Sequence, residues 1–303
     1  MKKTLFSLVV LLTLCSFIER ISPKLPLADM TLCKTGHNGQ VQAGDLYRKG
    51  SIIGSIISVN RTSKNVKAKY IAYKASGATV HERYDAWRKG KTPVLVSSGA
   101  YSTSFEDNGI PVGFTIDDGN LVNSSFESKM DGLIIVENIG GVRISNIEDG
   151  NLKINVNGKF ETIDIRNGLH RSRFLDWCKK EQATVFQTHL LIYDNKTKVS
   201  SNASSSKAIR RLLVMAKDAN GQLFHMILYP KQWSATLAET ADYTLNLLNS
   251  KGYQVLSAIN LDTGRIDVLA TSTELSDCKG NAITGESNLQ RQKISNMLVY
   301  YTE

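Results

Sequence analysis

Short segments in which apolar and polar residues alternate, each closed by a tight turn, recur along this sequence. Residues 51–59 and 66–73 show the pattern most clearly. Successive side chains of a strand point to opposite faces, so this alternation predicts strands with one buried face. Turn pairs such as Asp118-Gly119 and Asn157-Gly158 separate the segments. We expect strands over residues 51–59, 66–73, 92–96, 112–116, 133–136, 142–147, 152–156, 160–165, 185–193, 212–217, 223–228, 254–259 and 266–270.

Helical periodicity is confined to three segments, which interrupt the strands instead of alternating with them. We expect helices over residues 79–89, 171–182 and 237–250. The last has the clearest ends, with Ser234 or Thr236 as the N-cap and Gly252 as the terminator. The sequence therefore predicts an α+β fold with a mixed or antiparallel sheet and a few packed helices. Residues 29–303 are expected to form one domain, in which the polar residues 29–50 are a lead-in.

The first 28 residues have the pattern of a secretory signal peptide. Lys2 and Lys3 precede an apolar stretch over residues 5–18, which is too short to span a bilayer comfortably. This order predicts a protein that is secreted or periplasmic and that meets a membrane only through the signal segment. The sequence leaves the cleavage site open.

Charge and cysteine content narrow the chemistry further. The formal net charge is +9, yet no basic stripe interleaved with aromatic residues occurs, so we expect no nucleic-acid partner. With Cys15 in the signal segment, three cysteines remain, and an odd number cannot all pair. A Cys33–Cys278 disulfide is compatible with an oxidising compartment, whereas Cys178 fits the apolar face of a helix. No cysteine and histidine spacing suggests a metal site, no cofactor is required by the sequence, and the oligomeric state is left open.

Five segments follow one another in an order that is similar to the order of motifs in a known family. They are Ser97-Ser98-Gly99-Ala100-Tyr101; Pro111-Val112-Gly113 with Asp118-Gly119; Phe186-Gln187-Thr188-His189-Leu190-Leu191; Arg210-Arg211 with Asp218-Ala219-Asn220-Gly221; and residues 236–252 followed by Ala258-Ile259-Asn260-Leu261-Asp262-Thr263-Gly264. The order resembles the phosphodiester glycosidase family, which contains the uncovering enzyme N-acetylglucosamine-1-phosphodiester α-N-acetylglucosaminidase and many bacterial envelope relatives. The resemblance covers about residues 50–272. It implies a phosphodiester-glycosidase-like α+β domain and a hydrolase that cleaves a sugar-1-phosphodiester in glycan or exopolysaccharide metabolism.

The resemblance also implies roles for individual residues. Asp262 is the candidate catalytic carboxylate, which protonates the leaving oxygen or stabilises an oxocarbenium ion. Arg211 is the candidate phosphate ligand because a guanidinium binds a phosphodiester with two hydrogen bonds. Its neighbour Arg210 leaves this assignment uncertain by one residue. Asn260 lies two residues before Asp262, on the same strand face, and is expected to bind a sugar hydroxyl. Gln187 is expected to hold either a sugar hydroxyl or a loop carbonyl.

The loop with Ser97, Gly99 and Tyr101 completes the expected substrate site, and Gly99 allows close approach of a ligand. His189 follows Gln187 where the family has proline, and we interpret it as structural.

Several departures from the family pattern, including Ser97 for asparagine and Thr263 for glycine, support a second hypothesis. In this alternative the chain is a catalytically altered or inactive envelope protein that binds glycan or takes part in polysaccharide assembly. A structural envelope protein is the third hypothesis.

Overall fold

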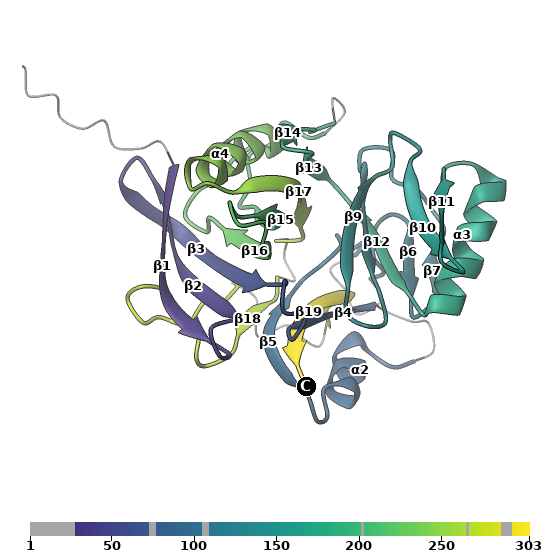
Figure 1. Cartoon of the computed structure of the whole chain (residues 1–303), viewed down its shortest axis with the longest axis horizontal. Coiled ribbons are helices and arrows are strands. Elements are labelled where there is room, and N and C mark those ends of the chain that lie inside the picture. The colour runs from purple at the N-terminus through teal and green to yellow at the C-terminus, as the bar shows by residue number, and fades with distance from the viewer. Residues whose placement is uncertain (1–27, 73–76, 105–108, 201–202, 265–266, 286–292) are drawn as a thin grey trace, which may run out of the picture.

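The computed structural model describes residues 28–303 apart from 73–76, 105–108, 201–202, 265–266 and 286–292 (Figure 1). The strands form four sheets, and every pairing among the described residues is antiparallel. The largest sheet has the order β1-β2-β3-β16-β15-β17-β13-β14. Its strands are β1 (Ala28–Gly36), β2 (Val41–Arg48), β3 (Ser51–Asn60), β16 (Leu223–Tyr229), β15 (Arg211–Lys217), β17 (Gln254–Leu261), β13 (Leu190–Tyr193) and β14 (Lys196–Thr197).

Three smaller sheets complete the fold. A five-stranded sheet runs β7 (Asn120–Asn123), β6 (Thr115–Asp117), β12 (Thr184–Thr188), β8 (Gly132–Val136) and β9 (Val142–Asn146). A four-stranded sheet runs β18 (Leu269–Thr271), β5 (Thr92–Ser97), β19 (Asn296–Thr302) and β4 (Lys67–Ala72). The hairpin of β10 (Leu152–Val156) and β11 (Lys159–Ile163) stands apart from them.

Each helix covers a different sheet and buries its apolar face against the strands. Helix α4 (Leu237–Ser250) packs on the eight-stranded sheet, and α2 (Val80–Trp87) packs on the four-stranded sheet. Helix α3 (Gly168–Glu181) packs against the β10–β11 hairpin (Figure 1). A separate apolar core joins the eight-, five- and four-stranded sheets, with Ile57, Phe186 and Tyr300 among its buried members. The α+β class predicted from the sequence is therefore confirmed, with antiparallel sheets.

The helix ends follow the local chemistry of the sequence. Thr236 caps α4 and Glu239 returns a bond to it, so the expected helix over residues 237–250 is confirmed at both ends. Helix α3 begins three residues before the expected range because Asn167 accepts bonds from the first turn. The Cys33–Cys278 disulfide is formed, and the thiol of Cys178 is buried and unpaired. Among the described residues, no helix has both the length and the apolarity needed to cross a membrane.

Three expectations need correction or lie outside the structure. Residues 29–50 are not a lead-in: they form the β1–β2 hairpin at the edge of the large sheet, where one exposed face accommodates their polar side chains. The single strand expected over 185–193 is divided at His189, because β12 and β13 belong to different sheets. The signal peptide expected over residues 1–28 lies outside the described residues apart from Ala28, the first residue of β1.

Candidate functional site

The candidate site lies where the chain passes from the five-stranded sheet to the eight-stranded sheet. His189 occupies this passage, and its carbonyl accepts a hydrogen bond of 3.0 Å from the backbone N–H of Asn260. The preceding hydroxyl, that of Thr188, donates to the carbonyl of Asn260 at 2.6 Å. These two bonds fix the carboxyl end of β17 against the end of β12. The site therefore has a rigid base, built from two sheets.

The loop after β5 closes over this base through backbone bonds. The N–H of Asp262 donates to the carbonyl of Gly99 at 3.0 Å. Gly99 and Ala100 are in turn held by Asn296 of β19, which accepts from one backbone N–H at 3.1 Å and donates to one carbonyl at 2.9 Å. A Cβ on Gly99 would lie 2.7 Å from the Tyr70 ring, so the close approach requires glycine. Sequence reasoning missed Asn296 because 197 positions separate it from Gly99.

A hydroxyl, an amide and a guanidinium meet in front of this loop. The Nδ2 of Asn260 donates to the Tyr101 hydroxyl, beside which the guanidinium of Arg210 also lies. Burial raises the pKa of Tyr101 to about 12, so the phenol stays protonated at neutral pH. The Oδ1 of Asn260 is buried and has no hydrogen-bond partner among the described residues. Such an acceptor is suited to a ligand hydroxyl.

Asp262 is the acid of the cluster. The residue is 8% exposed, and Oδ1 accepts a 2.8 Å hydrogen bond from the N–H of Gly264. Burial raises the pKa of the carboxyl to about 6, whereas the Gly264 N–H and the charge of Arg211 oppose the shift. A carboxyl group that titrates near pH 6 can both donate and accept a proton close to neutral pH.

His189 adds an imidazole to the same region. Its ring packs edge-on against the ring of Tyr101 at 5.6 Å between centroids. Nδ1 lies 2.9 Å from the carbonyl of Lys129, and because a carbonyl only accepts, Nδ1 carries the proton. Burial lowers the pKa of His189, so the ring is neutral at neutral pH.

Arg211 acts on Asp262 through its charge, but its guanidinium forms no hydrogen bond or ion pair with the described groups of this cluster. It is fully buried on the other face of β15, where Nη1 and Nη2 pair with the carboxylate of Asp267 at 2.6 and 2.9 Å. Its guanidinium also lies over the Tyr229 ring at 4.4 Å. Successive residues of a strand point to opposite faces, so it is Arg210 that faces Tyr101. Arg210 forms no ion pair with any described carboxylate, although it donates to the carbonyls of Ala235 and Ser206.

Gln187 and Ser97 are also engaged within the protein. The Gln187 amide accepts from the N–H groups of Phe114 and Glu127 and donates to the carbonyls of Glu127 and Met130. Its side chain therefore holds loop backbone, the second of the two roles expected from the sequence. The Ser97 hydroxyl donates to the carbonyl of Ser98 and accepts from Arg211 at 3.3 Å.

The structure thus brings together Asp262, Asn260, Tyr101 and Gly99 and adds Arg210 and His189. Arg211 and Ser97 form a buried support with Asp267, and Gln187 clamps a neighbouring loop. No set of three or more histidine, cysteine or acidic side chains among the described residues is arranged to hold a metal. Residues 105–108 and 265–266, near Tyr101 and Asp262 in sequence, lie outside the description.

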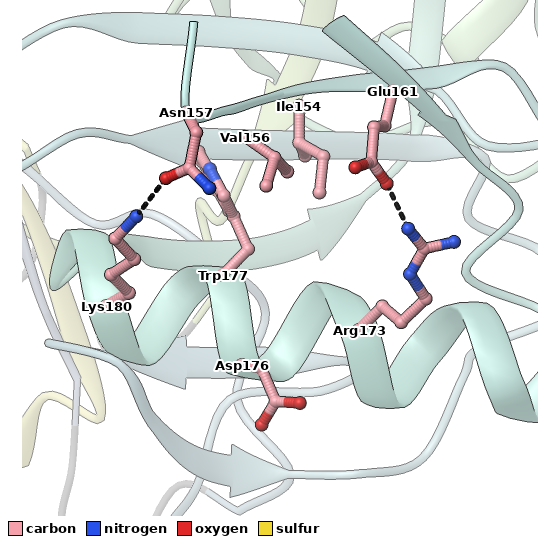
Figure 2. A pocket seen from close by; sticks show the side chains of 8 residues that line it. All are labelled: Ile154, Val156, Asn157, Glu161, Arg173, Asp176, Trp177 and Lys180. Atoms are coloured by element: carbon pink, nitrogen blue, oxygen red, sulfur yellow. Dashed lines mark hydrogen bonds and ion pairs between the residues drawn. The ribbon is translucent and has the colours of Figure 1, made fainter. Parts of the chain in front are cut away.

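A hollow of about 330 Å³ between α3 and the β10–β11 hairpin is a structural gap (Figure 2). Glu161 is paired with Arg173, and Lys180 donates to Asn157 at 2.8 Å, so these side chains tie the hairpin to the helix. Figure 2 shows Asp176 on the side of the helix opposite Ile154, Val156 and Glu161 of the hairpin. The charged groups of this hollow are therefore occupied or directed elsewhere.

Comparison with known proteins gives only distant likenesses. No family model and no curated protein matches the chain. A hypothetical protein from Synechocystis is 12% identical with a TM-score of 0.46, over 90% of this chain and 61% of that one. The catalytic domain of zebrafish N-acetylglucosamine-1-phosphodiester α-N-acetylglucosaminidase, auto-inhibited by its pro-peptide, is 12% identical with a TM-score of 0.47, over 92% and 89%. A Burkholderia pseudomallei protein provisionally described as exported is 10% identical with a TM-score of 0.42, over 81% and 73%. These likenesses concern overall shape and do not identify a ligand or a reaction for this chain.

Proposed function

We propose that this chain is a hydrolase of the phosphodiester-glycosidase type that cleaves a sugar-1-phosphodiester in the cell envelope. The observation that carries the proposal is Asp262, a buried carboxyl with a pKa of about 6 that lies near the Tyr101 phenol, which itself meets the Asn260 amide and the Arg210 guanidinium. The motif order, the signal segment and a role in glycan or exopolysaccharide metabolism, expected from the sequence, agree with this site.

Each group has a role in the proposed reaction. Arg210 attracts the phosphodiester because its charge is not neutralised by a described carboxylate. The Oδ1 of Asn260 accepts a hydrogen bond from a sugar hydroxyl. Protonated Asp262 gives its proton to the phosphate oxygen as the bond from the anomeric carbon breaks, and a water molecule supplies hydroxyl to that carbon. The products are the free sugar and a phosphomonoester, and Asp262 recovers its proton from the water.

The test uses the methyl diesters of glucose-1-phosphate and N-acetylglucosamine-1-phosphate, with release of free sugar measured by chromatography. We expect turnover by the wild type and a loss of 10²–10⁴-fold in Asp262→Asn, the usual range for an acid-base group, estimated roughly. Asp242→Asn removes an exposed carboxylate of α4 and serves as the matched control. Absence of turnover on both substrates by the wild type would refute the hydrolase.

One observation favours the second candidate, a glycan-binding protein without catalysis. The polar groups of Arg211, Gln187 and Ser97 are engaged inside the protein, which leaves fewer groups for a substrate than the motif order implies. If the methyl diesters bind without turnover, and Arg210→Gln abolishes that binding, this candidate replaces the first.

A further inference from the structure

A groove of about 770 Å³ lies between the five- and eight-stranded sheets. We call it the β9–β17 groove, because its lining residues come from β9, β10 and the turn between them on one side and from β13, β15 and β17 on the other. Figure 1 shows where these strands lie in the fold. Among the strands that the structure describes, β9 pairs with β8 alone, and residues of β9 line the groove. The groove is lined by Arg143, Ile144, Ser145, Asp149, Asn151, Lys153, Tyr193, Asp194, Met215, Leu256 and Ser257. Its volume is in the range of ligand sites.

Ser257 supplies the first sign of a ligand. It is 4% exposed and lies on β17 opposite both Tyr193 and Met215. Within the part of the chain that the structure describes, its hydroxyl has no hydrogen-bond partner, yet its side chain lines the groove. The hydroxyl is therefore open to the groove, where it can donate a hydrogen bond to a ligand or accept one from it.

An aromatic ring and an apolar floor lie beside this hydroxyl. Tyr193 is partly exposed, and Ile144, Met215 and Leu256 line the groove around it. Burial raises the pKa of Tyr193, and the nearby carboxylates of Asp149 and Asp194 raise it further. Both carboxylates line the groove with Tyr193, and one oxygen of Asp149 already accepts a 2.8 Å hydrogen bond from Asn146. The remaining carboxylate oxygens can accept hydrogen bonds from a ligand, while the ring offers an apolar face.

Carboxylates outnumber the available basic groups in the groove, although the chain has a net charge of +9. Arg143 is held by Glu137 at 3.0 Å and donates to the carbonyl of Lys153 at 2.6 Å, so it is not free for an anion. Lys153 remains, against Asp149 and Asp194. A polyanion would meet uncompensated carboxylates here, which favours a neutral ligand.

We propose that the β9–β17 groove binds a short segment of a neutral oligosaccharide. Sugar hydroxyls both donate and accept, which matches the serine hydroxyls, the carboxylates and Lys153, and the apolar faces of sugar rings fit Tyr193 and its apolar neighbours. The groove is separate from the candidate site. Ser257 and Asp262 are five positions apart along the β17 direction, or about 16 Å at about 3.3 Å per residue. Binding in the groove does not depend on hydrolysis.

An extended peptide added to the β9 edge is the competing occupant. The observations favour the sugar because Arg143 reaches from β9 to the Lys153 carbonyl and so crosses the edge along which a peptide would pair.

The test is titration of the full chain with cellotetraose, maltotetraose and chitotetraose, followed by calorimetry and by backbone NMR shifts. We expect at least one of them to bind, with shifts at Tyr193 and Ser257. We expect affinity to fall at least tenfold in Tyr193→Ala, to fall less in Tyr193→Phe, which keeps the ring, and to stay unchanged in Asp262→Asn. Tyr253→Ala, which removes another partly exposed tyrosine, is the matched control.

The exposed Asn151→Ala variant is a second probe, which is not expected to disturb folding. A moderate loss of binding in this variant supports the groove even if Tyr193→Ala is unstable. No binding of the three tetrasaccharides, shifts confined to the surroundings of Asp262, or tighter binding of a serine- and threonine-rich peptide to β9 would each overturn the proposal. None of these results depends on whether the methyl diesters are hydrolysed.

Discussion

The buried pair of Arg211 and Asp267 gives the sharpest test of how the candidate site is supported. In Asp267→Asn the guanidinium stays fully buried but loses its counter-charge, and the Tyr229 ring cannot replace that charge. At 2.6 Å and an effective dielectric constant of about 20, the lost attraction is on the order of 6 kcal/mol. Relaxation and water entry offset part of it, so we expect the free energy of unfolding to fall by about 3–5 kcal/mol.

Urea unfolding followed by tryptophan fluorescence measures this change, with Asp242→Asn as the exposed control, expected to stay within about 0.5 kcal/mol of the wild type. The double variant Arg211→Met with Asp267→Leu removes both charges, and we expect it to be more stable than Asp267→Asn alone. A loss below about 1 kcal/mol in Asp267→Asn would refute the reasoning, because that value is typical of a solvent-exposed pair.

The Asp267→Asn variant can also be tested through the pKa of Asp262. Asp267 raises the pKa of Asp262, whereas Arg211 lowers it. Removal of the Asp267 charge therefore lowers the pKa of Asp262 from about 6. The acidic form of Asp262, and with it any turnover of the methyl diesters, is then lost at a lower pH than in the wild type.

Three further predictions concern stability. The pKa of Asp262 is raised from 3.8 to about 6 in the folded protein, so the folded state binds more protons than the unfolded state between these values and loses stability as pH rises. Asp262→Asn should thus be more stable than the wild type by up to roughly 3 kcal/mol above pH 7 and show no such gain near pH 4; equal gains at both pH values in urea unfolding would contradict this. Gln187→Leu strands four backbone groups and should cost about 3 kcal/mol or more, whereas Gln187→Glu keeps two acceptors and should cost less; equal losses by calorimetry would contradict the clamp. Replacement of Cys33 and Cys278 by serine frees a loop of 245 positions and should cost about 2–5 kcal/mol, and unchanged unfolding by urea would show that the disulfide does not restrain the unfolded chain.

Local chemistry explains what the sequence predicts well. The start of α4 follows from Thr236 and Glu239, which act within one turn of the helix. The alternation over residues 51–59 anticipates β3 because one strand contains the whole signal. The β1–β2 hairpin was missed because its polar edge strand lacks clean alternation. Sequence patterns do not show which sheet a strand joins, and so the division at His189 could not be anticipated.

In the candidate site, too, the local features could be predicted from the sequence and the long-range contacts could not. Asn260 lies in β17 and Asp262 directly follows the end of that strand, so the alternation of side chains along a strand predicts a common direction for the two. The choice between Arg210 and Arg211 depends on which way each side chain points from β15. The residues that follow in β15 are apolar and buried on both faces of the strand, so the sequence pattern does not distinguish the two directions. The long-range partners Asp267 and Asn296 give no local signal. The roles of these residues in a reaction remain predictions for the experiments above.

The bonds from Asn296 to the loop after β5 also have a consequence for the order of folding. The Gly99 and Ala100 backbone can be held in place only after residues nearly 200 positions later have left the ribosome. Until then β4 and β5 lack the strand that lies between them, and two unpaired edges are exposed. Pairings so distant in sequence close slowly. The nascent chain should therefore depend on chaperones most during the interval before β19 arrives, and the loop with Tyr101 should be among the last parts to become ordered.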